Sequence, residues 1–343
     1  MRNFAIGVDL GGTNLRIAAV DDQGTLLEKV ALETKVALGR DQVIDNMCGA
    51  IEQLLDKHKD WGTLVGIGIG VPGIIELQSG LLRESPNLPG WGNYPVRDEI
   101  EKRLKAIVIL ENDANVAALG EQWLGAAKGF DDMAMITLGT GVGGGLVFGG
   151  TIWHGMSGMA GEVGHSTVEP EGHPCGCGNR GCVEQYAAAP AVVRMAREAI
   201  AANPASSLAR AAREDAEFSS QSIYNLATQG DEEAQKVFRR VGGAVGILLA
   251  TLVNSLNLPM YVIGGGVSSA WDAFSPSIFD ELRARSMVYA ATAPPDPHAR
   301  HDGASAHVIL AAGGKTIITR SLLGSEAGLY GAARLPMIPK SKW

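Results

Sequence analysis

Two segments far apart in the chain begin in the same way, as short apolar strands joined by glycine turns. The first covers residues 4–33 ("FAIGVDL", "NLRIAAVD", "LLEKVALE"), and the second covers residues 133–153 ("MAMITLGTGVGGGLVFGGTIW"). Alternating strand and helix patterns follow each of them, which is typical of α/β units. Because 343 residues exceed one ordinary hydrophobic core, we expect two α/β domains with a cleft between them.

Helical periodicity fills the intervals between the strand patterns. Residues 41–59 place apolar side chains on one face, with Asp41 close to a capping position, and helices dominate residues 190–257. We expect further strands at "LVGIGIGVPG", "AIVILEN", "MYVIGG" and "AHVILAA", a helix near 95–105 and a closing helix at "SEAGLYGAARLP". The Pro- and Gly-rich residues 293–306 predict a surface loop.

Three glycine-rich turns could hold phosphate groups: "DLGGTN" (9–14), "LGTGVGGG" (138–145) and "IGGGVSS" (263–269). Backbone N–H groups without a neighbouring Cβ form an anion cradle. Each turn alone favours a tight hairpin, but the three together shift the balance toward a phosphate-binding site.

Two better-known phosphate motifs fail on their context. Residues 68–73 and 139–144 satisfy G-x-G-x-x-G, but strand-like residues follow them, whereas a dinucleotide-binding loop opens a helix. "GGKT" at 313–316 resembles the end of a P-loop, yet Ile309 occupies the place of its first glycine.

The charge balance limits the classes of partner. Lys and Arg number 29 against 37 Asp and Glu, for a formal net charge of -8, so we expect no nucleic acid and no membrane surface among the partners. The apolar stretch 243–253 is shorter than the roughly 20 residues that cross a bilayer and predicts a buried helix. No export signal precedes the first strand pattern, so we expect a cytoplasmic protein.

Three of the four cysteines, Cys175, Cys177 and Cys182, lie within eight residues of a glycine-rich loop. In a reducing compartment such a cluster indicates metal rather than disulfides, and thiolates with one imidazole form a closed zinc site. The alternative is a mobile loop with free thiols. His173 is the nearest imidazole, and His165 is a second candidate. Cys48, on the apolar side of a helix, is expected to be a core residue.

Taken together, "IGVDLGGTNLRIA", "ENDANVAALGE", "TLGTGVGGGLV", "GMAGEVGH", "CGCGNRGCVEQY" and "VIGGGVS" resemble the ROK family of sugar kinases and sugar-responsive repressors. The resemblance runs from residue 4 to about 335 and is most specific over 161–186. It implies a two-domain actin-like/hexokinase-like ATPase fold, with a ribonuclease H-like motif in each lobe and an interdomain cleft. We expect a smaller lobe of residues 1–112 plus 321–343, and a larger lobe of residues 113–320 that carries the zinc loop and the helical region.

The resemblance also implies roles for individual residues. Asp113 would be the catalytic base, although Asn112 and Asp113 are equally good helix caps. Asp9 would hold Mg2+, unless it is only a turn aspartate. Zinc would be held by His165, Cys175, Cys177 and Cys182. The sugar would be bound by Asn87, which could also be only a turn residue, and by Asn112, Asp113, Glu162, His165 and Glu184. ATP would be bound by Gly11, Gly12, Thr13, Asn14, Gly139, Thr140, Gly141, Gly264, Gly265 and Gly266.

The activity that the resemblance implies is ATP-dependent phosphorylation of a hexose, with glucose as the expected acceptor, because the motifs look most like the glucokinase branch. Mannose, fructose or an N-acetylhexosamine are the alternatives. A sugar-responsive regulator is less expected, because such regulators carry a DNA-binding domain before the first glycine turn, where only "MRN" precedes the first strand. A catalytically silent sugar-binding protein is the third class. We expect a homo-oligomer, a dimer first.

Overall fold

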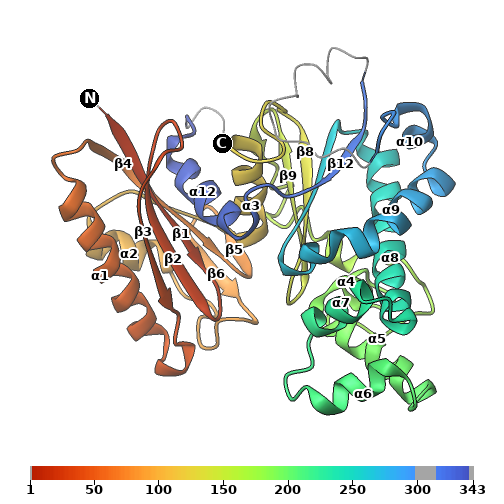
Figure 1. The fold of residues 1–343 in the computed structure, drawn as a ribbon. Helices are drawn as coiled ribbons and strands as arrows, with labels where there is room; N and C mark the ends of the chain where they lie inside the picture. Colours follow the sequence, from red (N-terminus) through yellow and green to blue (C-terminus); the bar gives the residue numbers. More distant parts are fainter. Residues whose placement is uncertain (1, 298–313, 340–343) are drawn as a thin grey trace.

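Two five-stranded sheets with the same topology form the centre of the computed structural model, which describes residues 2–297 and 314–339 (Figure 1). Their strand orders are β3-β2-β1-β4-β7 and β10-β9-β8-β11-β12. In each sheet the first three strands pair antiparallel and the last two add in parallel. The repeat expected from the glycine-hinged strands is therefore present.

The strands and helices have the following bounds. The first sheet comprises β1 (Asn3–Leu10), β2 (Asn14–Asp21), β3 (Leu26–Glu33), β4 (Thr63–Val71) and β7 (Val108–Asn112). The second comprises β8 (Met133–Leu138), β9 (Val142–Phe148), β10 (Thr151–Ile152), β11 (Met260–Gly264) and β12 (Ile317–Arg320). A small hairpin is formed by β5 (Ile74–Glu76) and β6 (Leu81–Glu84). The helices are α1 (Arg40–His58), α2 (Val96–Leu104), α3 (Asp113–Trp123), α4 (Glu184–Ala187), α5 (Ala189–Ala202), α6 (Ser207–Glu214), α7 (Ser220–Thr228), α8 (Glu232–Leu256), α9 (Trp271–Arg285), α10 (Met287–Thr292) and α12 (Ala327–Arg334).

Alternation along β1 gives the first sheet two different faces. Ile6, Val8 and Leu10 are fully buried in a core with α1 and α2. The opposite face is covered by α12 (Figure 1). It approaches so closely that a Cβ on Gly68 of β4 would stand 1.9 Å from the carbonyl oxygen of Ala332. Glycine at that position therefore allows the closing helix to pack on the sheet.

Helix α3 lies between the two sheets, since it contacts β4 and β7 of the first and β8 and β9 of the second. A Cβ on Gly331 would stand 1.6 Å from the carbonyl oxygen of Val116, so α12 packs directly on the backbone of α3. The predicted division at residues 112 and 321 stays a prediction. What the packing establishes is that the residues after β7 and β12 lie where the two halves meet.

The second core is built around the long helix α8, which is packed against α9 and against the second sheet. By length and composition this helix could span a membrane, but 61% of its most apolar window is buried inside the protein. The predicted buried helix at 243–253 is therefore present as part of α8, which extends beyond that apolar stretch on both sides.

Some local predictions need correction or stay open. Gly39, and not Asp41, is the N-cap of α1, while Asp41 lies in the first turn. The strand expected at 306–312 and most of the loop 293–306 lie outside the described residues. Strand β12 and the β5–β6 hairpin were not predicted. Both G-x-G-x-x-G matches do belong to strands and turns, because β4 ends within the first and β9 begins within the second.

Candidate active site

The turn from β7 into α3 positions Asn112 and Asp113. Asn112 is the N-cap, and its Oδ1 accepts hydrogen bonds from the backbone N–H groups of Ala114 (2.9 Å) and Asn115 (3.3 Å). Its Nδ2 donates to the carbonyl of Gly73 at 3.3 Å. The capping alternative therefore holds for Asn112, whereas Asp113 is the first residue of the helix itself.

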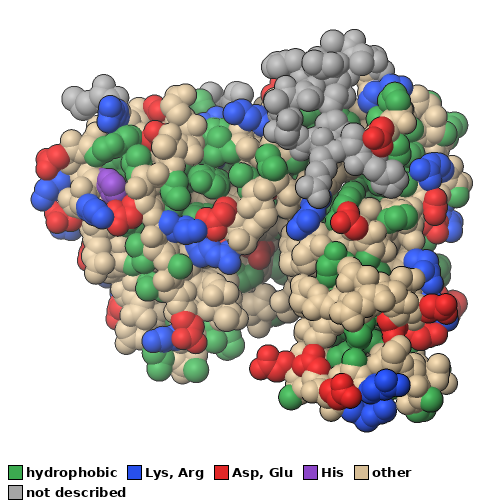
Figure 2. Space-filling view, viewed as in Figure 1, with side chains coloured by type: hydrophobic (Ala, Val, Ile, Leu, Met, Phe, Trp, Pro, Cys, Tyr) green, Lys and Arg blue, Asp and Glu red, His purple; other side chains and the backbone are tan. Residues whose placement is uncertain are grey.

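Asp113 is a carboxyl group with an altered pKa. Burial among protein atoms raises this pKa to about 6, and the negative charges of Asp9 and Glu162 add to the effect. Solvent nevertheless reaches the side chain, which is exposed by surface area. A group deep in an open cleft is surrounded by protein atoms and still reached by solvent. Figure 2 shows that the surface is hollowed between the two halves of the molecule. The raised pKa reflects this enclosure of the carboxyl group by protein atoms.

Strand register places Asp9 at the same edge of the sheet. Asp9 pairs with Gly70 of β4, and Gly70 pairs with Glu111 of β7, two residues before Asp113. Burial raises the pKa of Asp9, while Arg16, whose Nη1 lies 3.2 Å from Oδ2, opposes that rise. Carboxylate oxygens at a sheet edge are the donors that Mg2+ prefers, so the residues present fit that ion.

Each of the first two glycine turns is closed by a hydrogen bond from its first glycine. Gly11 donates its N–H to the carbonyl of Asn14 (2.9 Å), and Gly139 donates to the carbonyl of Gly141 (2.9 Å). Both turns follow the first strand of their sheet. A Cβ on Gly12 would lie 2.7 Å from the carbonyl oxygen of Asn87, which brings that predicted sugar residue beside the first turn.

The third glycine turn, at 264–266, packs on the end of β8. Gly265 has a φ of 81°, and a Cβ there would stand 2.4 Å from the carbonyl oxygen of Leu138. The turn is therefore adjacent to Gly139. Open space lies beside both Gly139 and Gly266.

The segment "GEVGH" is held against β9 by its glycines. A Cβ on Gly161 would meet the carbonyl oxygen of Gly144 at 2.6 Å, and a Cβ on Gly164 would meet that of Val142 at 1.9 Å. Glu162 and His165 thereby project from a segment fixed to the strand that follows the second glycine turn.

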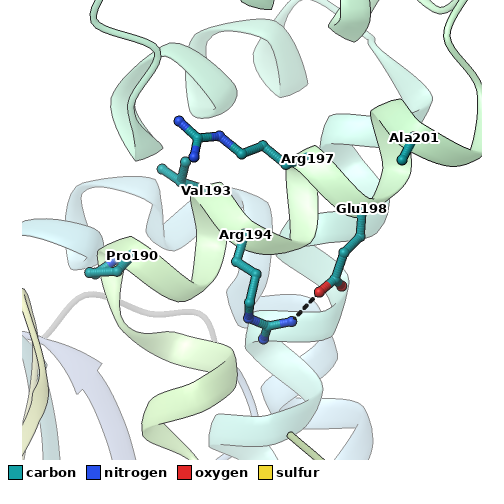
Figure 3. A pocket seen from close by; sticks show the side chains of 6 residues that line it. All are labelled: Pro190, Val193, Arg194, Arg197, Glu198 and Ala201. Carbon is teal, nitrogen blue, oxygen red and sulfur yellow. Dashed lines mark hydrogen bonds and ion pairs between the residues drawn. The ribbon is translucent and has the colours of Figure 1, made fainter.

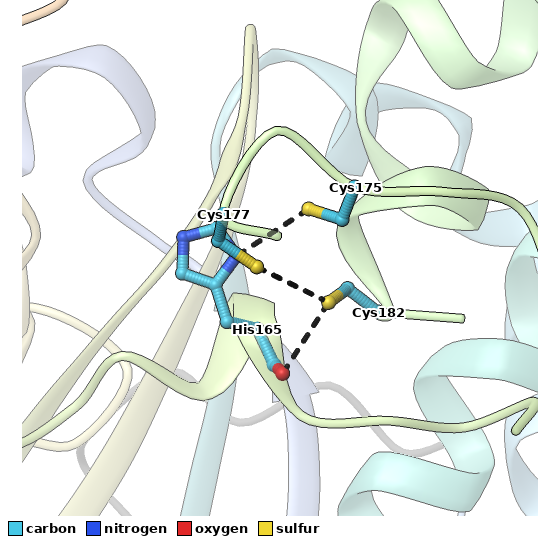
Figure 4. A group of neighbouring side chains, drawn as sticks. All are labelled: His165, Cys175, Cys177 and Cys182. Carbon is cyan, nitrogen blue, oxygen red and sulfur yellow. Dashed lines mark hydrogen bonds between the residues drawn. The ribbon is translucent and has the colours of Figure 1, made fainter. Parts of the chain in front are cut away.

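Three cysteines and His165 form a compact cluster (Figure 4). The four donor atoms lie within 4.8 Å of one another, and Cys177 Sγ is 3.7 Å from Cys182 Sγ. Zn–S bonds of about 2.3 Å in a tetrahedron place sulfur atoms about 3.8 Å apart, so the donor set fits zinc. His165 Nδ1 lies 3.7 Å from Cys175 Sγ, and Figure 4 shows Nε2 pointing away from the sulfurs. His173 instead turns Nδ1 to the carbonyl of Pro174 (3.0 Å).

Glu184 lies between this cluster and the second glycine turn. Its Oε2 accepts a hydrogen bond from the N–H of Val142 at 3.0 Å, and its Oε1 is 4.0 Å from Cys175 Sγ. This link to the glycine turn was not predicted from the sequence.

A family model described as "ROK family" matches residues 5–335. This chain belongs to the ROK family.

Its relatives in this family include kinases of similar length. A glucokinase of Halalkalibacterium halodurans is 37% identical over 96% of this chain and 94% of its own. A ROK hexokinase from Thermus thermophilus superposes with a TM-score of 0.75 at 32% identity, covering 96% of both chains. A ROK family glucokinase from Streptomyces griseus, solved with glucose and AMPPNP, gives 0.74 at 32% identity, with coverage of 97% and 98%. The predicted actin-like/hexokinase-like fold class is confirmed.

A second surface depression lies outside the candidate active site. A depression along α5 is lined by Pro190, Val193, Arg194, Arg197, Glu198 and Ala201 (Figure 3). Two of its charged groups are already engaged, since Arg194 pairs with Glu198 at 2.6 Å and donates to the carbonyl of Gln185. It shares no residue with the predicted site, so we give it no role in the chemistry.

Proposed function

We propose that this chain transfers the γ-phosphoryl group of ATP to the O6 hydroxyl of a hexose, with glucose as the preferred acceptor. The observation that carries the proposal is the position of Asp113: a carboxyl group with a raised pKa, at a sheet edge between two glycine hairpins. The kinship with glucokinases supports the choice of glucose. A base whose pKa lies near 6 is ionised at neutral pH and still accepts a proton effectively.

In the proposed mechanism Asp113 accepts the O6 proton as that oxygen attacks the γ-phosphorus. Transfer depends mainly on positioning and on charge neutralisation. The N-cap hydrogen bonds of Asn112 hold the turn, so that the carboxylate meets the hydroxyl in a fixed direction. Burial keeps the pKa of Asp113 high and the charge of Glu162 adds to it, whereas the effect of the Asp9 charge would be offset once Asp9 holds Mg2+.

The sugar would be oriented by polar groups from several segments. Amide, carboxylate and imidazole groups fix a polyol in one pose by hydrogen bonding. Asn112 can still contribute, because its NH2 group has two donor hydrogens and the structure uses one for Gly73. The residues that we propose for this role are Asn87, Asn112, Glu162, His165 and Glu184.

The nucleotide would lie across the three glycine turns. The N–H groups of residues 11–14 and 139–141 would face the phosphates, and residues 264–266 would lie on the adenosine side. Mg2+, which Asp9 would hold, neutralises charge on the transferring phosphoryl group. The two lobes, 1–112 with 321–343 and 113–320, would close on the bound substrates and exclude water.

Zinc, held by His165, Cys175, Cys177 and Cys182, would be structural. With Nδ1 facing the metal, Nε2 of His165 is directed to a sugar hydroxyl, and the fixed ring keeps that direction. We also propose a cytoplasmic homodimer that supplies sugar phosphate to glycolysis. Sedimentation analysis tests the dimer.

The test of the function is a coupled assay of ADP release with glucose, mannose, fructose and N-acetylglucosamine under one set of conditions. We expect the highest kcat/KM with glucose. If another hexose exceeds glucose, the kinase activity stands and the acceptor is wrong. If no hexose supports ADP release, the proposed function is wrong.

A further inference from the structure

A second carboxylate, Glu111, lies directly behind Asp113 and has no role in the mechanism above. It is the fourth residue of β7, and its side chain is 2% exposed. A carboxylate is almost never buried to this extent without partners. Its partners therefore indicate what it does.

One oxygen of Glu111 holds the turn that carries the proposed base. Oε1 accepts the backbone N–H of Asn112 at 2.9 Å and the side-chain amide of Asn115, also at 2.9 Å. These two donors flank Asp113 in the chain. The Glu111 carboxylate thus holds the backbone at Asn112 and the side chain of Asn115, and so fixes the first turn of α3.

The other oxygen reaches a different segment. Oε2 lies 2.6 Å from Nε2 of His154, which follows β10. His154 begins the stretch that ends at Glu162 and His165, and its carbonyl accepts the N–H of Ala160 at 3.1 Å. A short hydrogen bond to a buried carboxylate is among the stronger polar contacts in proteins.

The stretch 154–165 is therefore fixed at two places. Its far end is packed on β9 through Gly161 and Gly164, as described above. Its near end is tied to β7 by the contact of His154 with Glu111. Strand β9 also packs on the start of α3, where a Cβ on Gly145 would stand 2.8 Å from the carbonyl oxygen of Ala114. The contact of His154 with Glu111 is thus a second link between the sugar residues and the turn that carries Asp113, and we expect their spacing to be less closely held without it.

We propose that Glu111 and His154 are positioning residues, which set the spacing between the base Asp113 and the sugar-binding residues Glu162 and His165. The inference rests on the proposed kinase function. Neither side chain needs to touch the substrate for this role. Their effect is on the alignment of the hydroxyl with its base, to which transfer rates are sensitive.

The test uses His154→Leu, which fills the space without a hydrogen bond, and His154→Gln, whose amide nitrogen can reach the place of Nε2. The matched control is His58→Leu, because His58 forms a similar pair with Glu28 (3.2 Å) between α1 and β3, away from the site. Wild-type glucose phosphorylation is measured first. If the wild type is inactive, it is the proposed function that fails.

We expect His154→Leu to raise the KM for glucose about tenfold and to lower kcat, with the KM for ATP within about twofold of wild type. His154→Gln should recover most of the loss, and His58→Leu should leave all three constants unchanged. The proposal is overturned if His154→Leu has wild-type constants, or if His154→Gln is impaired as severely. Should His154→Leu not fold, His154→Asn, whose side chain is too short to reach Glu111, replaces it, and an unchanged KM for glucose then overturns the proposal.

Discussion

Burial raises the pKa of Asp113 and the charge of Asp9 adds to the rise, although Asp9 lies in β1 and Asp113 begins α3 after β7, on the other side of β4. Both lie at the carboxyl edge of the first sheet, where parallel strands bring their ends together. Like charges disfavour ionisation of one another. In the free protein the charge of Asp9 therefore favours the protonated form of Asp113, and a cation held by Asp9 would oppose that effect.

The first prediction concerns the pH dependence of activity. Asp113 must be ionised to act as a base, and its pKa is about 6. We therefore expect kcat/KM for glucose to rise with pH through about 6 and to level off above 7. Initial rates in a series of overlapping buffers measure this profile. A profile that stays flat down to pH 4.5 would contradict the assignment.

The second prediction is that Asp113→Asn lowers turnover by at least about 100-fold, the effect of losing a general base. Glucose binding should be largely retained, since the amide keeps the shape of the side chain. Tryptophan fluorescence titration measures binding separately from rate. Near-normal turnover would leave Asp113 as a helix-terminal residue without a catalytic role.

The third prediction concerns stability. The folded-state pKa of Asp113 is raised above its ordinary value of 3.8, so between these two values the folded protein binds more protons than the unfolded chain. Ionisation of Asp113 therefore removes stability as the pH rises from about 4 to about 6. Asp113→Asn avoids that loss, and its Tm should exceed that of wild type at pH 7.5 but not at pH 4. An equal difference in Tm at both pH values would argue against it.

The fourth prediction concerns the metal. Purified protein should contain about one zinc per chain, and Cys177→Ser should lose the zinc, part of the stability and much of the glucose affinity. Cys48→Ser is the control, because Cys48 is buried in the first core, away from the cluster. Elemental analysis and glucose titration provide the measurements. Zinc-free protein with unimpaired glucose affinity would separate the metal from the sugar site.

Local patterns predicted much of this architecture. The strands of each meander are neighbours in the chain, so turn residues and apolar runs suffice to indicate them. The cysteine spacing predicted a compact cluster, and the structure brings His165 to it rather than His173. Gly161 and Gly164 explain why "GEVGH" can lie against β9.

What the sequence did not predict depends on contacts between distant residues. Strand β12 has only four residues, and its place is set by parallel pairing with β11, more than fifty residues earlier. The pairing of Glu111 with His154 joins two halves of the chain. The sequence indicated this pair only through Glu111, a charged residue at the end of the apolar strand β7. A buried charge at that position needs a hydrogen-bonding partner.

The last prediction separates Glu184 from Glu162. Glu184 accepts a hydrogen bond from the N–H of Val142 and packs against the second glycine turn. A Cβ on Gly141 of that turn would lie 2.7 Å from Oε2 of Glu184. Glu184→Ala should therefore raise the KM for ATP as well as that for glucose, each about tenfold, because the freed N–H lets the turn move. Glu162→Ala should raise the KM for glucose alone.

Glu184→Gln serves as the control for this comparison, since its amide oxygen can still accept the Val142 N–H and should preserve the KM for ATP. Steady-state kinetics with each substrate varied in turn measure both constants. If Glu184→Ala changes only the KM for glucose, the contact with Val142 does not organise the phosphate site. Glu184 would then act on the sugar alone, as the sequence suggested.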